Sequence, residues 1–313
     1  MRELDEADVA RIVTPAAART IVREAFLALD AGRAHNPVRA VATPPGGWFA
    51  AMPAYVQLGA LGALGAKLVC VFPANAALGR PTHRAAVILF DPDDGAPIAR
   101  VAGDAITLRR TAAASLVATE ALAARADGRY AILGAGAQGR AHAEAFLDAG
   151  LVRSLCVWSR TREHALALAA PAAERVSVVV APTPDDAVAH ADVIVAATAS
   201  PVPLFDARSV QRHAHVNAVG ACVPAHRELP GALVAAAAFY ADSREAALRE
   251  AGDLLIAMPE FGLDATHVRA EIGRVLARGV PAPHDGPTIY ESLGLGILDV
   301  ACAAYALQHA GAC

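Results

Sequence analysis

Residues 129–146 read RYAILGAGAQGRAHAEAF, so that an apolar strand, a glycine-rich turn and a helix follow one another directly. Glycines with the spacing Gly-x-Gly-x-x-Gly permit a tight turn, a close approach of the backbone to a pyrophosphate, and close contact between helix and strand. The amino end of the helix adds N–H groups and a positive dipole end. A turn that is glycine-rich only for packing is the alternative. The context favours dinucleotide binding, with contacts from Gly134, Gly136, Ala137, Gln138 and Gly139.

Short apolar runs alternate with helical segments beyond this turn. The strand-like runs are residues 154–160, 176–181, 192–198, 213–220 and 237–242, and two helical segments at 162–174 and 184–191 separate the first three. This alternation predicts an α/β fold with a Rossmann-type, doubly wound parallel sheet. Thr198, Val219 and Gly220 end two of these runs, so we expect them at the carboxyl edge of the sheet, where cofactors bind in such folds.

The end of the second strand bears on the choice of dinucleotide. Sites that prefer NAD usually place an acid there to bind the ribose 2′-OH. Here the sequence is Ser159-Arg160-Thr161-Arg162, with no acid. Hydroxyl groups beside an arginine suit a 2′-phosphate, because arginine offers planar, paired donors. Solvated residues at a helix start are the plain alternative. We predict NADP as the cofactor, with NAD as the second choice.

The part of the chain before residue 104 has a different character. A helical segment up to about residue 33 precedes β-rich runs separated by Pro, Gly and Asp turns, which is typical of antiparallel hairpins. A helix is predicted from Asp104, as its N-cap, to about residue 126. The last segment, residues 292–310, reads as an apolar-faced helix without a strand partner. If it packs on the N-terminal sheet, that domain is discontinuous.

The composition argues against several classes of protein, among them nucleic-acid-binding and membrane proteins. The net charge of −4 gives no electrostatic basis for binding nucleic acid or an anionic membrane. No apolar run is long enough to span a bilayer, and the acidic N-terminus does not resemble an export signal. The five cysteines are scattered without a CxxC pair, so no disulfide framework and no metal site is predicted. We therefore expect a soluble cytoplasmic protein.

Lys67 is the only lysine among the 27 basic residues, and it lies in the apolar run AKLVCVF of residues 66–72. Unlike arginine, a desolvated lysine can change its protonation state. An isolated lysine in a strand of an arginine-rich chain is therefore a candidate catalytic residue.

Several motifs, in this order, resemble the ornithine cyclodeaminase/μ-crystallin family: VRAVA, AKLVCVFPAN, LRRTAAASLVAT, LGAGAQGRAHAEAF, VNAVGACVPAHREL, ADSREAALREAGDL and TIYESLGLGILD. The resemblance implies a dinucleotide-binding Rossmann domain, which we place at residues 114–289. It also implies a discontinuous α+β domain for substrate binding and dimerisation, at residues 1–113 and 290–313. A homodimer and a small α-imino or α-amino acid substrate are further implications.

The family holds its substrate carboxylate with a basic cluster, whose positions match Arg39, Lys67 and Arg110. Two arginine forks can clamp a carboxylate, and the lysine beside them can handle a proton. Without the resemblance, Arg39 and Arg110 would pass for ordinary surface or salt-bridge arginines. Thr82 and Thr111 are candidate contacts to the substrate and to a cofactor phosphate, respectively.

Two positions depart from the cyclodeaminases, which carry an aspartate and a glutamate where this chain has Cys222 and Ala50. Neither residue can accept a hydrogen bond from an ammonium group as a carboxylate does. The departures favour the reductase branch of the family, which transfers hydride from NAD(P)H to a C=N bond beside a carboxylate. Three alternatives remain: an ornithine cyclodeaminase, an alanine-type amino-acid dehydrogenase, and a non-catalytic binding protein. Lens μ-crystallin shows that the family permits the last of these.

Overall fold

The computed structural model describes residues 1–282 and 284–311. The chain divides into two compact units: residues 1–110 with 294–313, and residues 111–293. The first division falls inside one helix, α3 (Gly103–Leu122). Each unit is described by itself.

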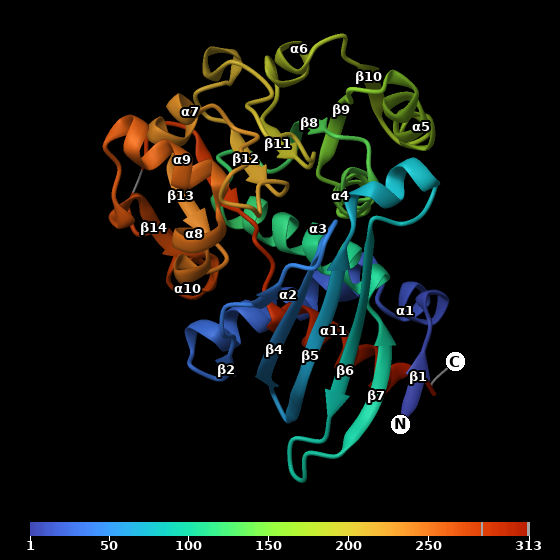
Figure 1. The fold of residues 1–313 in the computed structure, drawn as a ribbon. Helices are drawn as coiled ribbons and strands as arrows, with labels where there is room; N and C mark the ends of the chain where they lie inside the picture. The colour runs from blue at the N-terminus through green and yellow to red at the C-terminus, as the bar shows by residue number, and fades with distance from the viewer. Residues whose placement is uncertain (283, 312–313) are drawn as a thin grey trace. The chain divides into compact units, whose positions relative to one another are not determined.

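The first unit contains a mixed sheet that is antiparallel except at one edge (Figure 1). Its strand order is β1 (Arg2–Leu4), β7 (Pro97–Ala102), β6 (His83–Phe90), β5 (Leu61–Val71), β4 (Trp48–Leu58) and β2 (Ala34–His35), and β3 (Ala40–Ala42) also pairs with β4. The pairing of β1 with β7 is parallel. The β-rich runs of the sequence therefore form the hairpins that their turn residues predict.

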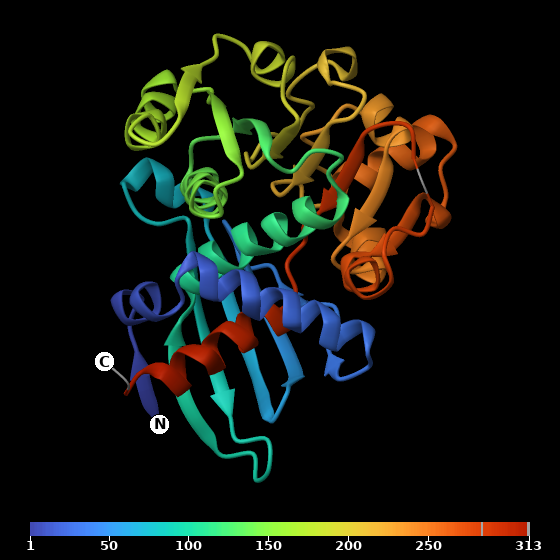
Figure 2. The ribbon, with the colours of Figure 1, turned by 180° about the vertical axis from the view of Figure 1, so that it is seen from behind.

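Two helices cover one face of this sheet, α2 (Pro15–Asp30) and α11 (Gly296–His309), as Figure 2 shows. The face beneath them is buried at alternate strand positions, among them Ala50 and Met52 of β4 and Val69 of β5. Because α11 lies almost 200 residues beyond β7 in the sequence, this unit is discontinuous, as the apolar pattern of residues 292–310 predicts.

The opposite face of the sheet is apolar, and among the described residues no helix of this unit covers it (Figure 1). Leu64 and Leu68 of β5 and Ile88 and Phe90 of β6 alternate with the buried positions and remain partly exposed. An apolar sheet face of this kind is typical of an interaction surface.

Short segments complete the first unit: α1 (Glu6–Ile12) and the 3-10 helix η1 (Pro73–Leu78). The carboxylate of Glu6 accepts hydrogen bonds from the backbone N–H groups of Asp104 and Ala105, at 3.2 and 2.6 Å. The prediction that Asp104 caps α3 is therefore wrong. The helix begins one residue earlier, and a distant glutamate supplies the cap.

The second unit is built on a wholly parallel sheet. Its strand order is β10 (Ser177–Val180), β9 (Val152–Trp158), β8 (Gly128–Leu133), β11 (Val193–Ala196), β12 (His215–Ala218), β15 (Thr288–Glu291), β13 (Ala238–Ala241) and β14 (Val268–Glu271). The order reverses between β8 and β11, which creates the switch point of a Rossmann fold. The predicted fold class is confirmed.

Helices accompany these strands along the chain. They are α4 (Ala137–Asp148), α5 (Arg162–Ala172), α6 (Pro184–Val188), α7 (Gly231–Ala236), α8 (Arg244–Glu250), α9 (Gly252–Phe261) and α10 (Ile272–Arg278), with 3-10 turns η2 (Ala207–Ser209) and η3 (Ala265–His267). Successive residues of β8 belong to different cores: Tyr130 and Ile132 pack with Phe146 of α4, whereas Ala131 and Leu133 pack with Leu233 of α7. The sheet is thus buried on both faces.

Two strands of the second unit, β14 and β15, were not predicted from the sequence. β15 inserts between β12 and β13, so that the second unit extends to residue 293. The predicted boundary after residue 289 would cut this strand. The four residues of β15, Thr-Ile-Tyr-Glu, are too few to show a periodicity, and the apolar pattern of the long helix after them is the stronger signal. Among the described residues, no helix combines the length and apolar character needed to cross a bilayer.

The glycine turn explains why α4 can begin directly after β8. Gly134 has a φ of 102°, in the region that L-residues rarely adopt. Gly139 lies in the first turns of α4, where an added Cβ would stand 1.8 Å from the carbonyl oxygen of Gly134. The helix therefore contacts the turn at a distance that only glycine permits.

This contact predicts that Gly139→Ala destabilises the fold itself. The methyl group cannot be accommodated without moving the turn, so we expect a loss of about 3 kcal/mol in the free energy of unfolding. Gly136→Ala is the matched control, because a Cβ there meets nothing within 4 Å and its φ is −74°. Urea unfolding measures both variants. Equal stabilities for the two would contradict this packing role of Gly139.

Candidate active site

Lys67 lies in the middle of β5, opposite Met52 of β4 and Val87 of β6. Its side chain points to the face of the sheet that the helices cover and is only 2% exposed. A buried ammonium group is costly unless a charge or several hydrogen bonds compensate it. The structure supplies that charge from a residue that the sequence analysis did not select.

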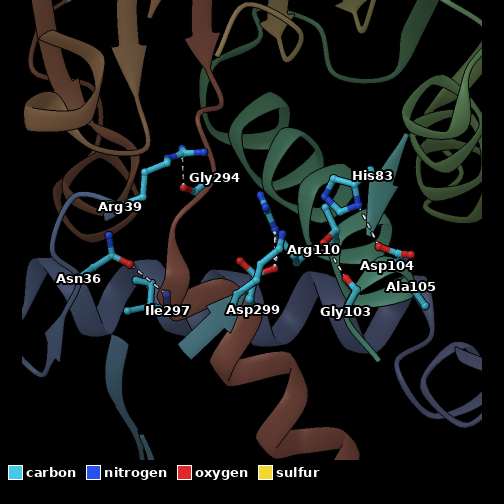
Figure 3. Close-up of polar contacts among 12 residues, drawn as sticks. Asn36, Arg39, His83, Gly103, Asp104, Ala105, Arg110, Gly294, Ile297 and Asp299 are labelled. Carbon is cyan, nitrogen blue, oxygen red and sulfur yellow. Dashed lines mark hydrogen bonds and ion pairs between the residues drawn. The ribbon is translucent and has the colours of Figure 1, made fainter. Parts of the chain in front are cut away.

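The compensating residue is Asp299, in the first turn of α11. Its Oδ1 lies 3.1 Å from the Nζ of Lys67 and 3.2 Å from the Nε of Arg110, which α3 contributes. Figure 3 shows the side chains of Asp299 and Arg110 meeting between the two helices. One oxygen of Asp299 thus holds together Lys67 and Arg110, two of the three residues that are predicted to bind the substrate carboxylate.

Burial and neighbouring charges act on Lys67 in opposite directions. Burial, with the charges of Arg110 and Arg39, lowers the pKa of Lys67 from 10.5 to about 8, against the opposing effect of Asp299. Since the folded value lies below the unfolded one, the unfolded chain binds more protons between about pH 8 and 10.5. The contribution of Lys67 to stability therefore rises with pH across that window.

Asp299 stays ionised in this setting. Burial alone would raise the pKa of its carboxyl group, but the charges of Arg110 and Lys67 outweigh burial and hold the pKa below its ordinary value. Lys67 and Arg110 both pair with this one anion, and Arg39 lies near enough for its charge to act on Lys67, so the cluster keeps an excess of positive charge. That excess suits a ligand with a carboxylate group.

Glycines near the start of α11 create room for this cluster. An added Cβ at Gly294 would lie 2.6 Å from Nη1 of Arg110, and at Gly296 it would lie 2.9 Å from the carbonyl oxygen of Met52. The carbonyl of Gly294 also accepts a hydrogen bond from Nη2 of Arg39, at 3.4 Å (Figure 3). The SLGLG motif therefore brings the two arginines and Asp299 into one place.

Thr82, the predicted substrate contact, is not part of this cluster. Val87 lies opposite Lys67, and Thr82 is five residues before Val87, just outside the start of β6. Its carbonyl accepts a hydrogen bond from the backbone N–H of Phe72. A substrate contact from Thr82 therefore stays a prediction.

The second unit carries the predicted dinucleotide contacts at one edge of its sheet. Gly136 is the N-cap of α4 and provides no side-chain cap, and both Gly136 and Ala137 are exposed. The Oε1 of Gln138 is buried without a hydrogen-bond partner. The first-turn N–H groups, the open space at Gly136 and the unsatisfied amide oxygen fit the phosphates and donor groups of a dinucleotide.

Ser159, Arg160 and Thr161 follow β9 beside the glycine turn, because the N–H of Gly134 donates to the carbonyl of Trp158. Arg160 and Thr161 are exposed, and Thr161 begins α5 without capping it. In the part of the chain that the structure describes, Arg160 has no ion pair. The triplet is placed where the second strand contacts the adenosine ribose in a Rossmann fold.

Polar contacts fix the part of α3 that belongs to the second unit. The Nε2 of His142 on α4 lies 2.9 Å from the Oγ of Ser115, and the Nδ2 of Asn217 on β12 donates to the Oγ1 of Thr119 at 2.9 Å. Burial lowers the pKa of His142 to about 4, so that this histidine is neutral at physiological pH. Thr111 is buried at the start of the same segment.

The structure also places the two positions that lack a carboxylate. Ala50 is fully buried on β4, on the same sheet face as Met52, the residue that lies opposite Lys67. The Sγ of Cys222 lies 3.4 and 3.7 Å from the carbonyl oxygens of Val219 and Ser292, either of which can accept its one S–H hydrogen bond. Neither position supplies a negative charge.

Within the described ranges, no three His, Cys, Asp or Glu side chains form a group that could hold a metal ion.

Comparison with known proteins adds a family to this geometry. The profile of the Ornithine cyclodeaminase/mu-crystallin family matches residues 3–311. The chain is 38% identical to ketimine reductase mu-crystallin of Mus musculus over 274 residues, which cover 87% of this chain and 84% of that protein. It is 36% identical to Δ1-pyrroline-2-carboxylate reductase of Bacillus cereus over 256 residues, or 80% and 78% of the two chains.

A solved structure is similar over the full length. The Δ1-pyrroline-2-carboxylate reductase of Thermococcus litoralis, in complex with NADH and L-proline, superposes with a TM-score of 0.94 at 29% identity. The match covers 100% of this chain and 98% of that one.

The cluster around Asp299 predicts a large effect of Asp299→Asn on stability. The substitution keeps the size of the side chain but leaves Lys67 and Arg110 buried without their counter-charge, so we expect the free energy of unfolding to fall by about 3–5 kcal/mol. Asp104→Asn is the control: it removes the partner of His83 in a half-exposed pair, for a loss of less than about 1 kcal/mol. Urea unfolding distinguishes the two, and a similar small loss for both would show that Asp299 carries no such role.

Proposed function

This chain belongs to the ornithine cyclodeaminase/mu-crystallin family, and we propose that it is an NADPH-dependent reductase of a small α-imino acid. Its curated relatives include a ketimine reductase and a Δ1-pyrroline-2-carboxylate reductase, which act on C=N bonds. The observation that carries the proposal is the buried pairing of Lys67 and Arg110 with the one carboxylate of Asp299, beside the half-buried Arg39.

In this proposal Arg39 and Arg110 hold the carboxylate of the substrate. Asp299 fixes the Nε edge of the Arg110 guanidinium, which leaves the other N–H groups of that fork to bind an anion. A carboxylate that enters the cluster replaces water as the partner of the excess positive charge. Since the surroundings are buried, this attraction is stronger than at an exposed site.

Lys67 supplies a proton to the imine nitrogen, or shares the carboxylate with the arginines. A pKa of about 8 keeps Lys67 mostly protonated at neutral pH while making its proton easier to release than that of an ordinary lysine. Protonation of the nitrogen makes the imine carbon a better hydride acceptor. When bound, the reduced nicotinamide supplies that hydride, so that the C=N bond becomes CH–NH.

NADP is the proposed dinucleotide because the end of β9 offers Ser159, Arg160 and Thr161 and no acid. An exposed guanidinium between two hydroxyl groups can donate to the oxygens of a 2′-phosphate, whereas the ribose 2′-OH of NAD would find no acid here to accept its hydrogen bond. The roles of Thr82 and Thr111 belong to the same proposal.

Ornithine cyclisation is disfavoured by the same geometry. A diamino acid needs a carboxylate for its distal amine, and Ala50 and Cys222 provide a methyl group and a thiol. Burial of an unpaired ammonium group would then oppose binding.

A homodimer is proposed on the uncovered apolar sheet face of the first unit, with Leu64, Leu68, Ile88 and Phe90 as its centre. A second copy of the same face would bury these side chains. The molar mass in solution tests this, and a monomer at micromolar concentration would contradict it.

The proposed activity is tested by NADPH oxidation with a panel of substrates. Pyrroline- and piperideine-2-carboxylates are expected to be reduced without added ammonia. Ornithine should release no ammonia. A requirement for free ammonia with pyruvate would favour an amino-acid dehydrogenase instead, and no turnover with any member would favour a binding protein.

Lys67→Arg tests the proton role. Arginine keeps the positive charge but does not release a proton near neutral pH. We expect kcat to fall at least about a hundredfold, the range of general acid catalysis, with the NADPH dissociation constant changed less than about twofold. The wild-type kcat/KM should fall as the pH rises above about 8, because Lys67 then loses its proton. Arg175→Lys, an exchange in an exposed pair with Asp148, is the control. Near-normal turnover by Lys67→Arg would leave Lys67 only as an anchor.

Arg160→Ala tests the choice of cofactor. Loss of the bonds to a 2′-phosphate should weaken NADPH binding by about ten- to a hundredfold and change NADH binding by less than about twofold. Arg153→Ala is matched, because Arg153 is an exposed arginine near the other end of β9 that pairs with Asp127. An equal loss for the two dinucleotides in Arg160→Ala would contradict the 2′-phosphate assignment.

A further inference from the structure

Glu228 is a buried acid that the proposed reaction does not use. It lies in the segment after β12 and is fully buried. One carboxyl oxygen, Oε1, accepts a hydrogen bond from the backbone N–H of Thr198 at 2.6 Å and a second one from the hydroxyl group of the same residue. The other, Oε2, accepts from the backbone N–H of Gly220 at 2.7 Å. A single carboxyl group therefore joins two separate segments.

These two segments are the ends of neighbouring parallel strands. Thr198 follows β11 and Gly220 follows β12, and both lie at the carboxyl edge of the sheet. Thr198 also borders the glycine turn, since a Cβ added to Gly134 would lie 2.9 Å from its Cγ2. The carboxyl group of Glu228 thus sets the position of the backbone beside the turn.

Glu228 is itself held in place by a second acid. The Oδ1 of Asp253, in the first turn of α9, accepts hydrogen bonds from the backbone N–H groups of Glu228 and Leu229, both at 2.8 Å. The carbonyl of Glu228 accepts from the N–H of Leu204. The backbone on both sides of the carboxyl group is therefore fixed.

This arrangement is expensive for a residue that only fills space. Burial, with the nearby charge of Asp253, raises the pKa of Glu228 to about 8, although the hydrogen bonds from Thr198 and Gly220 act to lower it. Among the described residues, no lysine, arginine or histidine forms an ion pair with Glu228. An apolar side chain of similar size would avoid this desolvation cost. The acid is explained if the site requires the backbone N–H groups of Thr198 and Gly220 to be held in a fixed orientation.

The two halves of a dinucleotide contact different strands. In a Rossmann fold the end of the second strand, here β9, contacts the adenosine ribose, which leaves the β11–β12 side for the nicotinamide half. We propose that Glu228 is a positioning residue for the nicotinamide half of the dinucleotide, acting through Thr198 and Gly220. The inference rests on the dinucleotide binding of the proposed function.

The test compares the whole cofactor with its adenosine half. Calorimetry measures the dissociation constants of NADPH, NADH, 2′,5′-ADP and ADP for the wild type and for Glu228→Ala. We expect the variant to bind both dinucleotides at least about tenfold more weakly, because two buried N–H groups lose their acceptor. Binding of 2′,5′-ADP and ADP should change less than about twofold. A purely structural role of Glu228 would weaken all four ligands together.

Gly220→Ala provides a second route to the same change. A Cβ at this position would lie 2.1 Å both from the Oε2 of Glu228 and from the backbone carbonyl oxygen of Thr198, so the methyl group separates the carboxyl group from the two strand ends without removing it. We expect the same selective loss of dinucleotide binding, even if Glu228→Ala folds poorly. Glu260→Gln is the control, because Glu260 forms only a surface pair with Arg227, and it should leave all four ligands unchanged.

The outcomes separate this inference from the function on which it rests. Wild-type protein that binds neither dinucleotide would overturn both. Wild-type binding that Glu228→Ala or Gly220→Ala leaves intact, or a loss shared equally by the adenosine fragments, would overturn the role of Glu228 alone.

Discussion

The buried carboxylate of Asp299 is the interaction on which the first unit depends. It pairs with Lys67 from the middle strands of the sheet and with Arg110 from α3, and it reaches both from α11 at the end of the chain. The unit is therefore discontinuous for a reason of charge as well as of packing. Without Asp299, two cations would be buried with no counter-charge. With it, the cluster still keeps enough positive charge to attract a second carboxylate.

The second unit depends on the position of its backbone, because a dinucleotide is bound largely by backbone groups. Gly134 and Gly139 let the helix approach the turn, and the N–H groups of α4 face outward where no side chain caps them. Backbone groups can recognise a ligand only if they are held still. Glu228 and Asp253 provide that rigidity at the neighbouring strand ends, with two buried carboxyl groups that accept backbone N–H bonds. The two units thus use buried acids in opposite ways, one to compensate charge and one to orient the backbone.

Much of this organisation could be predicted from local pattern. The Gly-x-Gly-x-x-Gly turn, the alternation of strands and helices, and the apolar final helix gave the Rossmann fold and the discontinuous unit. The lone Lys67 was visible because composition isolates it. Asp299 also has a signal, an acid within the apolar run ILDVACAA, but pattern alone does not say which cation it meets. Glu228 sits in an irregular segment, and its contacts to Thr198 and Gly220 arise only from tertiary structure. The boundary between the two units inside α3 has no signal in the sequence, since a helix that continues through a boundary needs no Gly or Pro there.

The central claim is that this cluster recognises a carboxylate next to the C=N bond. The most direct measurement compares kcat/KM for Δ1-pyrroline-2-carboxylate with that for 1-pyrroline, which has the same imine and lacks only the carboxylate. Two charge-assisted contacts and an unneutralised buried cluster predict a loss of at least about a thousandfold for 1-pyrroline. Reduction of both imines with similar kcat/KM would contradict the claim, because the cluster of Arg39, Lys67 and Arg110 would then serve the fold and not the substrate.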